Sequence, residues 1–306
     1  MKNIAVFLWC GHHNFGDDLF IESYKTLFPE CNIKIFTDAP NKTYPTLHFR
    51  HINEYDLFIL GGGELINADR LFIPPSWSKY IKIPKIILGC GVNAETAQQL
   101  SPKVVNELKN FAYIGLRDQT AVNILQQIPA IKNRVDLFYD LAYSLNIKKS
   151  LKQPLQNTAV VIPTDRVSNK ADLGIQNFNL HENSYSWLKT QLEPFDNATF
   201  LPFGIEDNND YETCRLLSSC SRNPTIIPHN FIQKEYVFNT IANTSHVITY
   251  RLHGMILSHI LNTPYTFYPY HWKLNRVHET IKNKSPTEIR NEQQIKIKTI
   301  VNVLAH

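Results

Sequence analysis

The sequence predicts an α/β protein of two Rossmann-like domains that face a cleft, and three observations support that prediction. Short apolar runs alternate with longer amphipathic stretches, which is typical of parallel sheets with helices on their faces. The length of 306 residues favours two domains over one. The stretch Asn146–Asn157 is polar, lysine-rich and poor in core residues, so we expect a linker there. The expected domains are therefore residues 1–148 and residues 149–306.

The first half alternates strands and helices in the order that a parallel sheet requires. Its first apolar run follows a single lysine and lacks a small-x-small cleavage site, so we expect a buried strand and not a signal peptide. Ser101 can cap a helix that has Pro102 at its first position. The expected strands are Ile4–Leu8, Ile33–Thr37, Leu57–Leu60, Lys85–Leu88, Tyr113–Leu116 and Val135–Phe138, and the expected helices are Asp17–Leu27, Pro102–Phe111 and Gln119–Gln127.

The second half repeats this alternation after the linker. Its expected strands are Ala159–Ile162, Ala198–Leu201, Thr225–Ile227, His246–Thr249 and Tyr265–Tyr268. Its expected helices are Glu182–Leu192, Asp210–Ser219, Lys234–Ala242 and His253–Leu261, with a last helix over Glu292–Ala305. Two such halves with a cleft between them are similar to the GT-B architecture, a likeness at the level of the fold alone.

Composition excludes several classes of protein. A net charge of +4 is too small and too dispersed for a nucleic-acid-binding protein, although it suits an anionic small molecule or an anionic membrane surface. The five scattered cysteines form no CxxC pair, so we expect a reduced, intracellular protein without a zinc site. No apolar run approaches the roughly 20 residues that span a bilayer. We expect the cytoplasm, with the cytoplasmic face of the inner membrane as an alternative.

Glycine is scarce, and its positions indicate a binding edge. Seven of the eleven glycines follow first-half strands: Gly11, Gly16, Gly61, Gly62, Gly63, Gly89 and Gly91. In open α/β sheets, ligands bind beyond the carboxyl ends of strands, where glycine permits close approach of the backbone. The run "GGG" at Gly61–Gly63 is more than a tight turn needs, so we expect it to approach a ligand or the other domain closely.

Two glycine motifs resemble nucleotide-binding loops without fitting them. In "LWCGHHNFGDDLF", Asp17 and Asp18 stand where a P-loop has Lys-Ser/Thr, and they would repel a phosphate. Two alternatives stay open for this loop: Asn14 or Asp17 caps the next helix, or its polar side chains hydrogen-bond sugar hydroxyls. The stretch "IILGCGVNA" has the spacing of a dinucleotide fingerprint, but it follows a later strand and lacks the acidic residue about 20 positions on.

Two arginines stand where strands end and helices begin. Arg117 in "LRDQTAVNIL" precedes Asp118, which either caps the helix and pairs with Arg117 or leaves Arg117 to grip an anion. In "TYRLHGM", Arg251 and His253 are two residues apart and would face one site if the segment is extended. Both lie next to a helix N-terminus, which also favours an anion.

The stretch "YPYHWKLNR" follows the next strand. Alone it is a solvated loop, but it brings Lys273 and Arg276 to the same edge, where they can complete an anion site. His259, on the helix that follows Arg251, is expected to be a packing residue.

Together these motifs resemble the polysaccharide pyruvyl transferase family over most of the chain. The N-x-G-D element appears as Asn14, Gly16 and Asp17, and the next element is "DLFILGGG". The elements "LRDQTAVNIL", "YDLAYSL", "RLHG" and "HWK" follow in order. The resemblance implies a GT-B-like enzyme that transfers pyruvyl from phosphoenolpyruvate (PEP) to a sugar of a bacterial cell-surface polysaccharide or its precursor, with no other cofactor and no metal.

The resemblance also implies roles for individual residues. Arg117, Arg251 and Lys273 would bind PEP, and His253 would be the catalytic acid. We expect the acceptor sugar, as a glycan, a lipid-linked or a nucleotide-linked sugar, at Asn14, Gly16, Asp17, Gly61, Gly62 and Gly63. Asp17 and Glu64 are candidates for the general base. Two alternatives stay open: a GT-B glycosyltransferase that uses a nucleotide sugar, and a non-catalytic glycan-binding relative.

Overall fold

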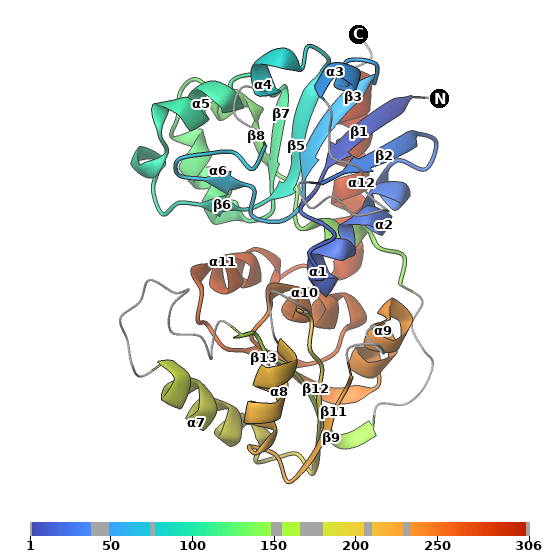
Figure 1. Cartoon of the computed structure of the whole chain (residues 1–306), viewed down its shortest axis with the longest axis vertical. Coiled ribbons are helices and arrows are strands. Elements are labelled where there is room, and N and C mark those ends of the chain that lie inside the picture. The colour runs from blue at the N-terminus through green and yellow to red at the C-terminus, as the bar shows by residue number, and fades with distance from the viewer. Residues whose placement is uncertain are drawn as a thin grey trace. The chain divides into compact units, whose positions relative to one another are not determined.

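A computed structural model of the chain describes residues 2–37, 49–73, 77–147, 155–165, 180–204, 210–228 and 233–303 (Figure 1). Its internal contacts divide the chain into two compact units. Unit 1 comprises Met1–Gly11, Asp17–Leu145 and Arg276–His306, and unit 2 comprises His12–Gly16 and Asn146–Asn275. Each unit is an α/β structure with a parallel sheet, as the sequence predicts.

Unit 1 contains a sheet of six parallel strands within the described residues. The strand order is β2 (Asn32–Phe36), β1 (Asn3–Phe7), β3 (Leu57–Gly61), β5 (Lys85–Cys90), β7 (Tyr113–Leu116) and β8 (Val135–Leu137). Two short strands, β4 (Ile66–Asn67) and β6 (Val92–Asn93), pair separately. The predicted strands of the first half are all present, with ends that shift by one or two residues.

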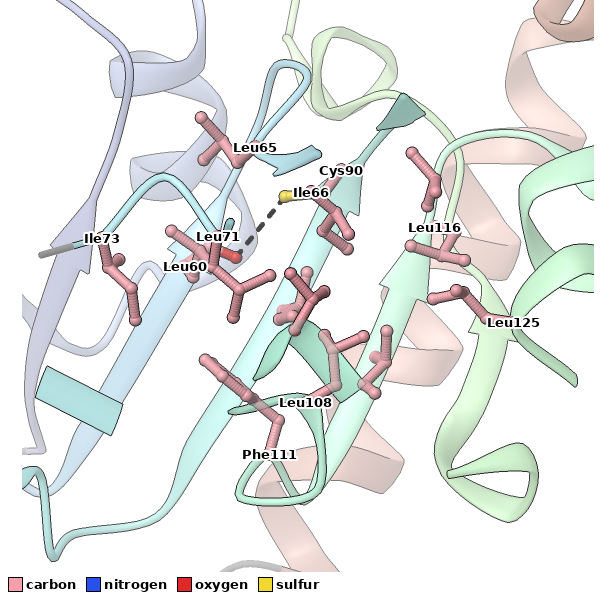
Figure 2. Close-up of a cluster of buried hydrophobic side chains, with 14 of the residues drawn as sticks. Leu60, Leu65, Ile66, Leu71, Ile73, Cys90, Leu108, Phe111, Leu116 and Leu125 are labelled. Atoms are coloured by element: carbon pink, nitrogen blue, oxygen red, sulfur yellow. Dashed lines mark hydrogen bonds between the residues drawn. The ribbon is translucent and has the colours of Figure 1, made fainter. Parts of the chain in front are cut away.

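Alternate residues of these strands enter two separate cores. Ala5, Phe58 and Ile87 face one core, which α5 (Pro102–Leu108) and α6 (Gln119–Gln126) complete. Figure 2 shows part of this cluster, in which the Cys90 thiol points toward the carbonyl of Leu60 at 3.8 Å. The alternation is the two-residue period of a sheet that is buried on both faces.

The opposite face of the sheet is covered by helices from the two ends of the chain. There Ile4 and Ile59 pack with α2 (Phe20–Leu27) and with Ile297 and Ile300 of α12 (Pro286–Val303). In Figure 1, α12, drawn in red, lies beside the blue strands β1 and β2. The short helices are α1 (Phe15–Asp18), α3 (Phe49–Ile52) and α4 (Trp77–Tyr80), with 3₁₀ turns at Ala97–Gln99, Lys132–Arg134 and Leu141–Ser144.

Unit 2 contains a second parallel sheet, of five strands within the described residues. Their order is β11 (Asn223–Ile226), β10 (Asn197–Phe200), β9 (Leu155–Ile162), β12 (Thr244–Thr249) and β13 (Tyr265–Phe267). One face packs against α7 (Leu180–Leu192) and α8 (Asp210–Ser218). Unit 2 also contains α9 (Lys234–Ala242), α10 (Leu252–Leu261) and the start of α11 (Trp272–Ile281), which continues into unit 1 from Arg276 on.

The structure divides the chain differently from the predicted domains at both ends. The last segment, predicted to belong to the C-terminal domain, joins unit 1 because the apolar side of α12 fills the core beside β1 and α2. The loop His12–Gly16 joins unit 2, where the Phe15 amide donates to the Phe203 carbonyl at 2.8 Å. β9 begins inside the predicted linker, of which residues 148–154 lie outside the described residues.

The second part of the stretch predicted as a solvated loop after β13 belongs to α11, which begins at Trp272. Leu274, Val277 and Ile281 of this helix are buried, at 0%, 1% and 0% exposure, so its apolar residues recur at helical spacing. Within the described residues, no helix combines the length and the apolar character needed to cross a bilayer.

Candidate functional site

Arg117 occupies the carboxyl end of β7 in unit 1, with its side chain only 3% exposed. Its position depends on Gly91, because a Cβ added there would lie 2.7 Å from Nη2 of the guanidinium. Asp118 follows as the N-cap of α6 and accepts a hydrogen bond from the Ala121 amide at 2.8 Å. Asp118 is therefore the helix cap that the sequence offered as one alternative, and it does not hold Arg117.

Two other carboxylates stand near the Arg117 guanidinium, and neither binds it closely. Nη2 is 3.5 Å from Glu64 Oε2, and Nη1 is 3.9 Å from Asp140 Oδ2. Nε forms no hydrogen bond with any described residue. Arginine has five N–H donors in a planar fork, so a guanidinium held this loosely retains donors for a carboxylate or phosphate. The geometry suits the anion-binding role predicted for Arg117.

Close packing explains two of the three glycines at Gly61–Gly63, and the third has more room around it. A Cβ at Gly61 would lie 1.6 Å from the Tyr24 hydroxyl, and a Cβ at Gly62 would lie 2.3 Å from the Phe20 ring. At Gly63 the nearest atom would be Asp17 Oδ1 at 3.8 Å. Packing by aromatic side chains thus explains Gly61 and Gly62 without a ligand, which corrects the reason given from sequence. Acceptor binding at this run stays a prediction, and Gly63 is its best-placed member.

Arg251 lies in unit 2 and has a negatively charged partner within the protein. Its Nη2 donates to Asp210 Oδ1 at 2.6 Å, its Nε donates to the Pro163 carbonyl at 3.2 Å, and Asp165 Oδ1 is 3.8 Å away. Burial alone would lower the pKa of Arg251, but the Asp210 carboxylate outweighs this and raises it. Because Asp210 neutralises this arginine within the protein, a ligand is not needed to explain its burial.

His253 does not share a direction with Arg251 in the way the sequence predicts. Arg251 is extended (φ −107°, ψ 139°), but α10 begins at Leu252, so the two-residue alternation of a strand stops there. The His253 ring is 8% exposed and lies against α1, because a Cβ at Gly16 would be 2.0 Å from its Nδ1. The need for glycine at position 254 has a different reason, because a Cβ there would lie 2.2 Å from the Thr249 hydroxyl. Two motifs far apart in sequence therefore meet at His253 and Gly16.

The loop that carries Gly16 is anchored in unit 2. Asn14 Oδ1 accepts a hydrogen bond from the Gly16 amide at 3.3 Å, so Asn14 acts as the helix cap. Its backbone forms an antiparallel bridge with Gly204. The predicted acceptor residues are consequently divided, with Asn14 and Gly16 in unit 2 and Asp17 and Gly61–Gly63 in unit 1.

Lys273 and Arg276 lie on α11, at the point where the chain passes from unit 2 to unit 1. The backbone amide of Lys273, the second residue of the helix, donates to His271 Nδ1 at 3.3 Å. Arg276 donates from Nη1 to the Ala94 carbonyl in unit 1 at 3.1 Å. Lys273 therefore belongs to unit 2 and Arg276 to unit 1, and the expectation that the two complete an anion site stays a prediction.

Three carboxylates near the arginines were not predicted to act on them. Asp140 lies in the motif "YDLAYSL", but Glu64 and Asp210 are 53 and 41 positions away from the arginines that they contact.

Within the described ranges, no group of three or more His, Cys, Asp or Glu side chains is arranged to hold a metal ion. Burial raises the pKa of the Cys90 thiol to about 12, so this cysteine is not a nucleophile at neutral pH.

Comparison with known proteins supports the family resemblance. The model of a family described as polysaccharide pyruvyl transferase matches residues 14–271, a range that includes Arg117, Arg251 and His253. No curated protein matches the sequence.

Solved structures show what fold the chain shares. A protein of uncharacterised function from Klebsiella pneumoniae is 16% identical with a TM-score of 0.54, over 92% of this chain and 90% of that one. UDP-GlcNAc 2-epimerases from Methanocaldococcus jannaschii and Neisseria meningitidis are 11% and 12% identical, each with a TM-score of 0.56. These likenesses cover 99% of this chain and 99% and 100% of theirs. At such identities they show the fold alone, which is of the GT-B type.

Proposed function

The chain belongs to the polysaccharide pyruvyl transferase family, and from that premise we propose that it transfers pyruvyl from PEP to a sugar of a bacterial cell-surface polysaccharide or its precursor. The products are a pyruvate ketal and inorganic phosphate. The observation that carries the proposal is the Arg117 guanidinium, which is buried at a strand end, is held by its carboxylates only at 3.5 and 3.9 Å, and lies within the matched range.

The charge of PEP explains why this class of substrate suits the chain. PEP carries a carboxylate and a phosphate, so a binding site needs several cations. Arginine matches a planar carboxylate with two parallel hydrogen bonds, and lysine serves a phosphate as a point charge. We assign Arg117 and Arg251 to the PEP anion and Lys273 to its phosphate. Because Arg251 already binds Asp210, it contributes fewer free donors than Arg117.

Ketal formation requires one proton transfer to carbon. A proton added to the methylene carbon of PEP leaves an oxocarbenium-like centre at the neighbouring carbon, and a sugar hydroxyl attacks that centre. The carbon–oxygen bond to phosphate then breaks, and a second hydroxyl of the sugar closes the ring. The two hydroxyl protons balance the proton taken up by the methyl group and the one carried away by phosphate.

His253 is the residue that we assign to the proton transfer. Histidine is the side chain that enzymes use most often as a general acid. Its contact with Gly16 holds the ring in one place, and fixed geometry is what general acid catalysis requires. We place the acceptor sugar near Asn14, Gly16, Asp17 and Gly63, with Asp17 or Glu64 as the base. In this proposal the reaction uses PEP as co-substrate and no other cofactor, and it takes place in the cytoplasm.

A nucleotide-sugar transferase is the second candidate. It is favoured by the likeness in fold to an epimerase whose structure was solved with UDP-GlcNAc bound. Calorimetric titration of the protein with PEP and with UDP-GlcNAc separates the two candidates. We expect PEP to bind with an affinity that falls as salt is added, because the contacts are charged. Saturable binding of UDP-GlcNAc, with no binding of PEP, contradicts the proposal.

A further inference from the structure

We propose that Asp210 is a positioning residue: it fixes the Arg251 guanidinium and, through Phe203 and Gly204, the loop Asn14–Gly16 against which His253 rests. The inference goes deeper into the proposed function and rests on it only for its effect on PEP. The residues involved all belong to unit 2.

The Asp210 carboxylate has no exposed surface and accepts four hydrogen bonds. Oδ1 accepts from Arg251 Nη2 at 2.6 Å and from the Asp165 amide at 2.9 Å. Oδ2 accepts from the amides of Phe203 at 3.2 Å and Gly204 at 2.7 Å. A carboxylate has about four lone-pair sites, so these donors fill its capacity and fix its orientation.

The same two residues that bind Asp210 Oδ2 also hold the N-terminal loop. The Phe203 carbonyl accepts from the Phe15 amide at 2.8 Å, and the two phenyl rings lie 4.8 Å apart. Gly204 forms the backbone bridge with Asn14. Gly16, the next residue of the loop, makes the close contact with His253.

One buried carboxylate therefore connects Arg251, which is predicted to bind PEP, with the loop Asn14–Gly16, which is predicted to bind the acceptor and lies against His253. Its Oδ1 determines the orientation of Arg251, and its Oδ2 determines the position of the loop beside His253. An asparagine at this position keeps one acceptor oxygen but turns an NH₂ group toward N–H donors. It can therefore satisfy Arg251 or the amides of Phe203 and Gly204, but not both.

The test compares Asp210→Asn with Glu212→Gln, a matched control on the same helix whose carboxylate binds exposed Arg215 at 3.2 Å. Asp210→Asn should weaken PEP binding at least tenfold and speed hydrogen exchange at the Phe15 amide, whereas the control should change neither. An Asp210→Asn variant with a lower melting temperature, but unchanged PEP affinity and unchanged Phe15 exchange, shows a merely structural role and overturns the proposal.

A double-mutant cycle separates positioning from general destabilisation. In an Arg251→Met background, Asp210→Asn should cause no further loss of PEP affinity, because the group it positions is gone. Full additivity of the two losses contradicts the proposal. If Asp210→Asn does not fold, Asp210→Glu keeps the charge and displaces it, and the same readouts apply.

Hydrogen exchange at the Phe15 amide tests the link from Asp210 to the loop whether or not the protein binds PEP. If the parent protein does not bind PEP, the proposed function fails, but faster exchange at Phe15 in Asp210→Asn still supports the link from Asp210 to the loop. Unchanged exchange overturns it in either case.

Discussion

Replacing Gly16 by Ala tests the contact on which the assignment of His253 depends. The new Cβ would stand 2.0 Å from Nδ1, 2.3 Å from Cγ and 2.7 Å from Cβ of His253. Ordinary carbon contacts lie at about 3.5–4.0 Å, so the ring has to move by roughly 1.5 Å or the loop has to retreat. Gly16 is not among the glycines with positive φ, so its backbone accepts alanine without strain.

The expected cost follows from these distances. Overpacking of this kind destabilises by about 1–3 kcal/mol, partly offset by about 0.5–1 kcal/mol for replacing glycine with alanine in a helix. Misplacing a catalytic group by about 1 Å costs about 10²-fold in rate, so kcat should fall by at least that much while the variant remains folded.

The assay measures the urea midpoint and kcat on the same preparations of four proteins: parent, Gly16→Ala, His253→Ala and the double variant. Removing the imidazole ends the overlaps at 2.0 and 2.3 Å but leaves the 2.7 Å approach to the His253 Cβ, so Gly16→Ala should destabilise the His253→Ala protein clearly less than it destabilises the parent. Equal effects of Gly16→Ala in both backgrounds, or a stable variant with parental kcat, refute the proposed contact.

Four further expectations concern single residues. His253→Ala should lose about 10²–10⁴-fold in kcat with a much smaller change in PEP affinity; a destabilised variant with parental turnover removes His253 from catalysis. Arg117→Met should weaken PEP binding, measured by calorimetry, by about 1.5–3 kcal/mol; unchanged affinity excludes Arg117 from the site. Burial favours the protonated form of Asp118 and raises its pKa in the folded state above the usual 3.8. Its contribution to the free energy of unfolding is therefore present below that pH and is lost as the pH rises through the folded-state pKa. Asp118→Asn keeps the helix cap, and its urea midpoint should exceed the parent's increasingly over that range; parallel curves contradict this. Gly62→Ala, at φ +78° and 2.3 Å from the Phe20 ring, should lower the urea midpoint more than Gly63→Ala, at φ +74° where the nearest atom would be 3.8 Å away. Equal losses show that backbone strain, and not the clash with Phe20, determines the cost.

The strands and most helices of both sheets follow from local patterns in the sequence. Apolar runs such as Leu57–Leu60 are buried on both faces of a parallel sheet, and this gives a continuous signal that needs no knowledge of distant residues. The helix α11 escaped prediction because aromatic and basic residues at its start, "HWK", obscure the helical spacing of Leu274, Val277 and Ile281.

The interaction partners of the site residues do not follow from local sequence patterns. Asp210 lies 41 positions from Arg251, and nothing near either residue indicates the pair. The contact of Gly16 with His253 joins two residues that most of the chain separates. The triple glycine predicts close approach of a ligand or of the other domain, whereas Tyr24 and Phe20 occupy the space beside its first two members. Long-range packing decides each of these cases, and a local pattern carries no information about it.

Transfer of label from ¹³C-labelled PEP to sugar tests the central claim most directly. The protein is incubated with labelled PEP and a panel of lipid-linked and nucleotide-linked sugars, and the products are analysed by mass spectrometry and carbon NMR. We expect one acceptor to gain a labelled pyruvate ketal, with one phosphate released for each ketal formed, and we expect the Arg117→Met protein to lose this activity. Release of a nucleotide from a sugar donor, with no label in any product, contradicts pyruvyl transfer.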